Sequence, residues 1–231
     1  MRRLLLISAS WSLLLSAPAA SAQDVGSGWS VEGEIGVVTD YRFRGASLSG
    51  TDPAVQGGVT AWNAGSGLYG FVWVSTIEEY GLDASGNGAE IEVTLGVGWS
   101  GEALGYVFDI GVEAYQYPRG QGVNYVEFPL SAERAVGPVT LSAGLAWAPE
   151  QNALGNEDNT YVWTGVDYAP DGWPLSLNAR LGHEDGGFAP DGKTDWSVGL
   201  KAPVSRLTLG LDWIDSDADD GTVVASVFAT F

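Results

Sequence analysis

Apolar and polar residues alternate strictly along much of this chain. The pattern is clearest from Glu90 to Trp99, where apolar side chains take the odd positions and glutamate, threonine and glycine take the even ones. No window of comparable length repeats every 3.6 residues. A period of two is typical of a β-strand with one apolar face, so the pattern predicts an all-β chain. The same alternation recurs in four further stretches: 139–147, 175–182, 207–213 and 222–231.

Twelve such segments follow one another, and the connections between them alternate in length. Gly101-Glu102-Ala103 and Pro170-Asp171-Gly172 are tight connections. The longer connections are acidic and cover residues 79–88, 149–158, 184–193 and 215–220. The twelve predicted strands cover approximately residues 29–44, 53–63, 67–78, 89–100, 104–117, 123–134, 138–148, 159–169, 173–183, 194–202, 205–214 and 221–231.

Short turns at one end and longer loops at the other are typical of outer-membrane barrels. Segments of about 9–11 residues are long enough for a tilted strand to cross the hydrocarbon layer. A closed barrel also leaves no unpaired strand edge in lipid. We therefore predict that residues 23–231 form one antiparallel transmembrane β-barrel of 12 strands, with short periplasmic turns and longer acidic extracellular loops.

Most aromatic residues fall near the predicted strand ends, where amphipathic rings favour the membrane interface. This placement predicts two aromatic belts, whereas a soluble sandwich would bury its rings in mid-strand. The periplasmic belt would contain Trp29, Trp62, Tyr69, Trp99, Tyr106, Tyr168, Trp173 and Phe231. The outer belt would contain Tyr41, Phe43, Tyr115, Tyr117, Tyr125, Trp147, Tyr161, Trp163, Trp196 and Trp213.

The first 22 residues have the three parts of a secretory signal peptide. Arg2 and Arg3 form a basic start, residues 4–15 form an apolar stretch, and Ala20-Ser21-Ala22 forms a small-residue cleavage site. The apolar stretch is too short for a spanning helix. We expect cleavage near Ala22 and insertion of the mature chain into the outer membrane of a Gram-negative cell, among its lipid and lipopolysaccharide.

Composition narrows the function classes. The 231 residues include 33 glycines, no cysteine, one histidine and one methionine, with a formal charge of −19. Such a negative charge argues against nucleic acid as a partner, because phosphate binding needs basic patches. The lack of cysteine excludes a disulfide scaffold and a thiolate metal site. Aromatic residues at 11% are too frequent for a disordered acidic chain.

One motif resembles a known family. The stretch Thr39-Asp40-Tyr41-Arg42-Phe43-Arg44-Gly45, followed by Ser47, Pro53 and Gln56-Gly57-Gly58, resembles the opening of the TorF-type family of porins. Gly67, Tyr69 and Trp73 stand where that family has a Gly-x-Tyr…Trp strand, and Thr39 departs from its usual Ser. The resemblance implies a small proteobacterial outer-membrane barrel. Terminal Phe231 also resembles the signature read by the barrel assembly machinery, an expected partner.

If the polar parity of each strand faces inward, acidic residues outnumber basic ones in the lumen. Charged rings select ions of opposite sign, so this wall favours a narrow pore for cations or neutral polar solutes. The alternative is that the charges pair across strands and plug the barrel. The inward residues would be Glu32, Glu34, Asp40, Arg42, Arg44, Glu90, Glu92, Asp109, Glu113, Glu127, Glu133, Asn178, Arg180, Asp195, Lys201 and Asp212.

Asp40, Arg42 and Arg44 lie together near the outer end of the first predicted strand. An acid between guanidinium groups could hold a constriction or grip a carboxylate solute in bidentate fashion. The alternative, which we favour, is a structural salt-bridge cluster that fixes the strand register.

Other candidate sites are weak. In the segment 215–221 the glycine comes one position late for a calcium loop, and Ser226 stands where the bidentate Glu is needed. His183 would need a serine nucleophile beside it to form a lipid hydrolase. We expect no catalytic residue, cofactor or metal. The sequence thus predicts a porin-like channel for passive diffusion of small polar or cationic solutes. The alternatives are a closed structural or adhesion barrel and, with less support, a lipid hydrolase.

Overall fold

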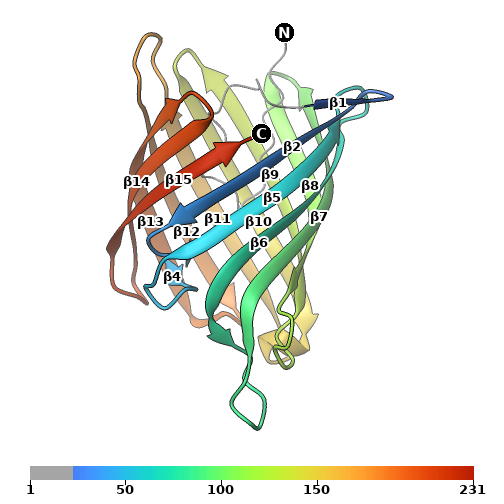
Figure 1. Ribbon diagram of the computed structural model, residues 1–231, viewed down its shortest axis with the longest axis vertical. Coiled ribbons are helices and arrows are strands. Elements are labelled where there is room, and N and C mark those ends of the chain that lie inside the picture. The colour runs from blue at the N-terminus through green and yellow to red at the C-terminus, as the bar shows by residue number, and fades with distance from the viewer. Residues whose placement is uncertain (1–22) are drawn as a thin grey trace.

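The alternating segments pair in chain order, each antiparallel to the next, in the computed structural model, which describes residues 23–231 (Figure 1). The first barrel strand, β2, pairs with both β5 and β15, and this closes the sheet. The predicted fold class and strand number are therefore confirmed. The barrel strands are β2 (Trp29–Val38), β5 (Ala54–Asn63), β6 (Leu68–Tyr80), β7 (Ala89–Ala103), β8 (Tyr106–Gln116), β9 (Tyr125–Val136), β10 (Val139–Gln151), β11 (Glu157–Tyr168), β12 (Ser176–Gly186), β13 (Ala189–Val204), β14 (Leu207–Ser216) and β15 (Thr222–Thr230).

Four short elements complete the fold. One short strand pairs with the start of β2, two others pair with each other in the connection between β2 and β5, and one 3₁₀ turn joins β10 to β11. These elements are β1 (Gln23–Gly26), β3 (Arg42–Phe43), β4 (Ala46–Ser47) and η1 (Asn152–Leu154). The described residues contain no helix that is long and apolar enough to cross a membrane. The predicted signal peptide, residues 1–22, lies outside them.

Two predicted boundaries are wrong. The first barrel strand ends at Val38 rather than near residue 44, and the chain then leaves the wall until Ala54. The long connection expected over residues 184–193 is instead a tight hairpin, because β12 continues to Gly186 and β13 begins at Ala189. Residues 184 and 193 therefore belong to the wall, and their side chains can face the lumen.

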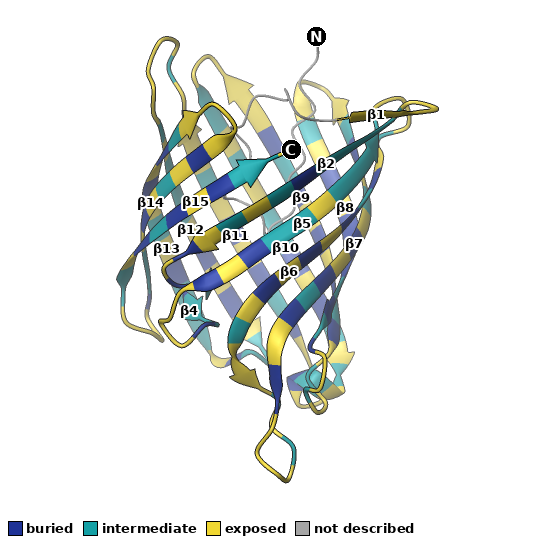
Figure 2. Ribbon diagram, viewed as in Figure 1, coloured by how far each residue is buried: buried dark blue, intermediate teal, exposed yellow. Residues whose placement is uncertain are grey.

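Burial alternates along the strands with the sense expected for lipid on the outside (Figure 2). On β7, Leu95 and Val97 are exposed, whereas Glu92 and Thr94 are 1% and 2% exposed. Apolar side chains thus face outward and polar side chains face inward, which reverses the order of a soluble protein. An apolar exterior of this kind needs lipid around it.

Inward glycines make room for aromatic rings of the neighbouring strand. A Cβ at Gly96 would meet the ring of Phe71, and a Cβ at Gly182 would meet the ring of Tyr161. In each case the ring and the glycine lie on neighbouring strands, β6 and β7 or β11 and β12. The pairing explains part of the high glycine content, because bulky rings line the interior of a wall that curves inward.

Candidate functional site

The connection between β2 and β5 turns into the lumen. Its two short strands, β3 and β4, are joined by Arg44 and Gly45, whose φ angles are +50° and +84°. Two consecutive positive φ angles are typical of a type I′ hairpin turn. A Cβ at Gly45 would meet the Ser216 and Asp195 side chains, so the turn lies directly against the inner wall. We call residues 39–53 the inward loop.

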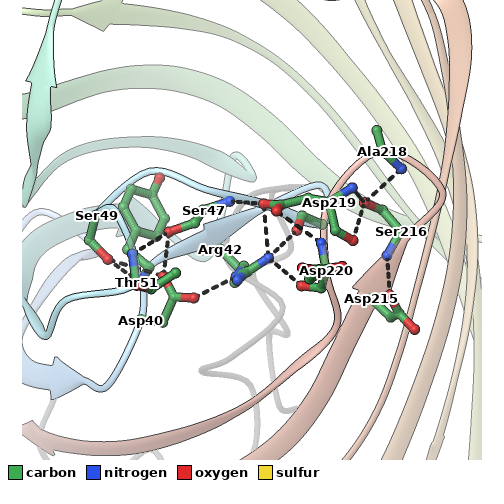
Figure 3. Close-up of polar contacts among 12 residues, drawn as sticks. Asp40, Arg42, Ser47, Ser49, Thr51, Asp215, Ser216, Ala218, Asp219 and Asp220 are labelled. Carbon is green, nitrogen blue, oxygen red and sulfur yellow. Dashed lines mark hydrogen bonds and ion pairs between the residues drawn. The ribbon is translucent and has the colours of Figure 1, made fainter.

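Arg42 anchors the inward loop to the loop between β14 and β15 (Figure 3). Its Nε donates to Asp40 Oδ2 at 2.6 Å, and its Nη1 donates to Asp219 Oδ2 at 3.0 Å. The hydroxyl of Ser47 donates to Asp40 at 2.6 Å, and the Ser47 amide donates to Asp219 at 3.1 Å. Asp40 and Arg42 therefore serve the structural role that the sequence favoured, but they fix a loop rather than the strand register.

Arg44, at the tip of the hairpin, reaches across the lumen. Its Nη2 lies 2.6 Å from Glu127 Oε2 on β9, and its Nη1 lies 2.7 Å from Glu184 Oε1 on β12. The three side chains are 4%, 1% and 2% exposed. Burial lowers the pKa of the Arg44 guanidinium, but the two carboxylates raise the pKa by more, so it lies above its usual value and the group stays charged.

Glu184 is shared among several donors. Lys193 Nζ on β13 lies 2.6 Å from Glu184 Oε2, and the Asn159 amide donates to Glu184 Oε1 at 3.1 Å. The Arg44 Cζ also lies 4.6 Å and 4.4 Å from the ring centroids of Phe43 and Tyr161. The tip of the inward loop is thus held by charge and by aromatic faces together.

Tyrosine hydroxyls bind the carboxylate of Glu92 on β7, away from the Arg44 site. Tyr41 and Tyr117 donate to the two oxygens of Glu92 at 3.2 Å and 3.1 Å. The rings of Tyr115 and Tyr125 stack with centroids 4.4 Å apart. The part of the lumen around the inward loop is therefore lined by aromatic rings and acids.

Most of the residues predicted to face inward do so. Glu32, Glu34, Asn178 and Arg180 are partly exposed on the inward parity of their strands. Glu90 is exposed instead, because the β6–β7 register shifts between Thr76 and Tyr80 and offsets the alternation at the strand end. That these residues line a path for solutes stays a prediction. The buried ones are Glu92, Asp109, Glu113, Glu127, Glu133, Asp195, Lys201 and Asp212.

The placement of Asp40, Arg42 and Arg44 on the first barrel strand is wrong. All three lie on the inward loop, because the wall strand already ends at Val38, and the positive φ angles at Arg44 and Gly45 then fold the loop into a hairpin. The lumen still receives their charges, but from a loop that crosses it.

The predicted outer belt is wrong for most of its rings. Phe43 is half-buried on the inward loop, and the remaining misplaced rings are buried on the lumen side. Both faces of these strands carry bulky residues, so alternation alone did not separate them. The buried rings are Tyr41, Tyr115, Tyr117, Tyr125, Tyr161 and Trp163, and Tyr69 of the predicted periplasmic belt is buried as well.

The aromatics that we expect at the membrane interface keep an outward placement. Trp29 is partly buried, and the others are exposed: Trp99, Trp147, Trp173, Trp196, Trp213 and Phe231. Their contact with the interface stays a prediction.

Sequence reasoning missed Glu184, Lys193 and Asn159. Glu184 shares the parity of Arg180 and Gly182, and continuing the predicted strand 173–183 by one residue would have included it. The predicted strand ends at residue 183, which leaves Glu184 in the acidic connection expected over residues 184–193.

Three comparisons place the chain among known proteins. The sequence model of the bacterial family described as "Bacterial protein of unknown function (Gcw_chp)" matches residues 22–230. No curated protein matches the chain. An outer-membrane channel from Pseudomonas putida F1 superposes with a TM-score of 0.53 at 12% identity, over 93% of this chain and 99% of that one. A membrane protein from work on in-meso crystallization superposes with a TM-score of 0.52 at 11% identity, over 87% and 83%. These likenesses show a shared barrel fold.

Proposed function

The chain belongs to the bacterial family of unknown function Gcw_chp, and we propose that it is an outer-membrane channel for passive diffusion of small polar or cationic solutes. The barrel fold is shared with an outer-membrane channel. The motif at residues 39–45 resembles that of the TorF-type porins. In this proposal the mature chain begins after cleavage near Ala22, and Phe231 serves as the signal for the barrel assembly machinery.

The observation that carries the proposal is the inward loop with the charges around it. The loop reaches the inner wall at Arg44, which pairs with β9 and β12, and the charged side chains that β7–β9 bury on the lumen side are all acidic. Glu127 Oε1, Asp109 Oδ2 and Asp195 Oδ2 are buried and accept no hydrogen bond from the described residues. Buried negative potential that is only partly compensated attracts cations and repels anions.

Single-channel recording in planar bilayers tests the proposal. Purified, refolded protein should give discrete conductance steps in KCl, and heat-modifiable gel migration should confirm in parallel that the barrel has folded. A folded barrel without conductance steps would overturn the channel function.

A closed structural or adhesion barrel is the second candidate, and the double ion pair of Arg44 favours it. This contact pins the inward loop across the lumen from β9 to β12. Changing Arg44 to serine separates the two functions. If the wild type and the variant are both folded and neither conducts ions, the barrel is a closed one, and residues besides the inward loop close it.

The lipid-hydrolase alternative finds less support. His183 is exposed on the parity opposite to the lumen, and its Nδ1 lies 3.1 Å from Thr194 Oγ1. For His183 to act as a general base, a nucleophilic serine would have to stand where the Thr194 hydroxyl lies.

A further inference from the structure

The Arg44 guanidinium fills a site that other parts of the chain build. Glu127 on β9 and Glu184 on β12 each bind a different nitrogen of the fork, at 2.6 Å and 2.7 Å. The Tyr161 ring on β11 offers its face at 4.4 Å from Cζ. Two carboxylates and an aromatic face thus converge on one planar cation, and such a geometry suits guanidinium better than a compact ammonium.

The charge balance of the site requires one monovalent cation. Lys193 pairs with the second oxygen of Glu184 at 2.6 Å. Within residues 23–231, Glu127 forms one ion pair, with Arg44, and its other oxygen accepts no hydrogen bond. Two carboxylates and one ammonium leave a single negative charge. Without a guanidinium in place, Glu127 would be a buried and uncompensated anion, which is costly.

The occupant of the site is tethered separately from the site itself. Arg44 sits at the two-residue tip of the hairpin, whereas Arg42 pairs with Asp40 within the loop and anchors the loop to Asp219. The Arg44 side chain can therefore leave the carboxylates by rotation about its own bonds. The anchor of the inward loop does not have to break.

A second guanidinium, that of Arg180, lies next to this site on β12, the strand that also carries Glu184. Arg180 Cζ is 3.9 Å from the centroid of Trp163 and 5.8 Å from the centroid of Tyr161. The two inward rings of β11 thus bind arginine side chains in succession along the lumen. Aromatic faces are suited to weakly hydrated planar cations, since such cations lose little hydration on stacking.

We propose that the site filled by Arg44 recognises small guanidinium-bearing cations, which pass the constriction by exchanging with the Arg44 side chain. The passage rests on the channel function proposed above. The binding does not, because it needs only the folded barrel.

Chemical rescue of the Arg44→Ala variant tests the binding. Guanidinium chloride at millimolar concentration should raise the Tm of this variant, read from heat-modifiable migration, by about 3 °C at roughly tenfold excess over the Kd. Equal NaCl should not raise it, and wild type should not respond. Arg134→Ala is the matched control, since Arg134 stacks on Tyr106 at 5.0 Å on the exposed side and forms no ion pair with a carboxylate of residues 23–231.

The double variant Arg44→Ala/Glu127→Gln should lose the rescue, because the uncompensated carboxylate is gone. If the Tm of Arg44→Ala rises equally in guanidinium and in NaCl, or if Arg134→Ala responds as much, the site is overturned. Should Arg44→Ala refold poorly, its refolding yield is the readout. Guanidinium then restores the yield if the proposal holds, and an unchanged yield contradicts it.

Conductance separates this inference from the channel function. A conducting barrel whose Arg44→Ala variant ignores guanidinium would overturn the recognition site and leave the channel standing. A barrel that binds guanidinium without conducting would overturn the channel and the exchange during passage, while the site would stand.

Discussion

Two arcs of the inner wall bury carboxylates, and they stabilise them in different ways. On β7, β8 and β9 the inward charges are all acidic, and we call this arc the acidic wall: Glu92, Asp109, Glu113, Glu127 and Glu133. On β12, β13 and β14 acids and bases alternate, and we call this arc the mixed wall: Arg180, Glu184, Lys193, Asp195, Lys201 and Asp212.

The acidic wall relies on tyrosine hydroxyls. Tyr117 donates to Glu92 at 3.1 Å, Tyr115 donates to Glu113 at 2.8 Å, and Tyr69 donates to Asp109 at 2.8 Å. A hydroxyl fixes the position of a carboxylate without cancelling its charge. The mixed wall places a base beside its acids and is nearly neutral. The difference implies that the potential felt by a solute is set by the acidic wall, with Arg44 as the bridge between the two walls.

Removing the bridge should have the largest effect. We expect Arg44→Ala to lower the free energy of unfolding by about 3–5 kcal/mol, because it leaves Glu127 buried without its partner. Urea unfolding of the barrel in detergent or lipid measures the change. Arg206→Ala, at an exposed position in the β13–β14 turn, is the control. Equal stability of the two variants would contradict the bridging role.

Removing a tyrosine hydroxyl from the acidic wall should have the second-largest effect on the free energy of unfolding. Tyr117→Phe removes a hydroxyl from Glu92 and should lower the free energy of unfolding by about 1.5–3 kcal/mol, the range for hydrogen bonds to charged groups. Tyr106→Phe is the matched control, since its hydroxyl meets exposed Arg134 at 3.1 Å. If the control loses as much stability, the hydroxyls do not support the acids.

The glycine positions beneath the rings test packing on both arcs. Gly96→Ala on β7 and Gly182→Ala on β12 would bring a Cβ into the rings of Phe71 and Tyr161, and each should cost about 1–3 kcal/mol by overpacking. Gly70→Ala has ordinary contact distances and should cost less. Thermal unfolding of the three variants provides the comparison, and equal costs would mean that the rings shift freely.

Ion selectivity should respond to one arc more than to the other. Asp109→Asn with Glu133→Gln on the acidic wall should lower the cation-to-anion permeability ratio roughly two- to fivefold, through weaker attraction of cations. Asp212→Asn on the mixed wall, beside Lys201, should change the ratio less. Reversal potentials in a KCl gradient measure both. A larger effect from the mixed wall would show that the assignment of the potential to the acidic wall is wrong.

The barrel could be read from the sequence because lipid and lumen impose opposite polarity on successive residues. The segment from Glu90 to Trp99 shows this directly, and the structure places it on β7 as expected. The strand number followed from twelve segments separated by recognisable connections, although the alternation is not equally clear in all of them. The inward loop could not be read in the same way, since Asp40 to Arg44 alternates like a strand and only backbone angles at Arg44 and Gly45 reveal the hairpin.

The aromatic rings that face the lumen could not be predicted from the sequence, for a related reason. A tyrosine such as Tyr161 is compatible with the membrane interface and with the lumen, and its side is decided by Gly182 on the neighbouring strand. That pairing depends on register, which is a property of two strands. The Arg44 site likewise combines residues from β9, β11, β12 and the inward loop, so no local sequence pattern predicts it.

The reversal potential of the wild-type barrel in a KCl gradient tests the central claim most directly. An acidic wall that outweighs the mixed wall predicts a potential toward the K⁺ equilibrium value, from channels whose barrel is shown to be folded by heat-modifiable migration. A potential toward the Cl⁻ equilibrium value, or a folded barrel that gives no current, would contradict the account.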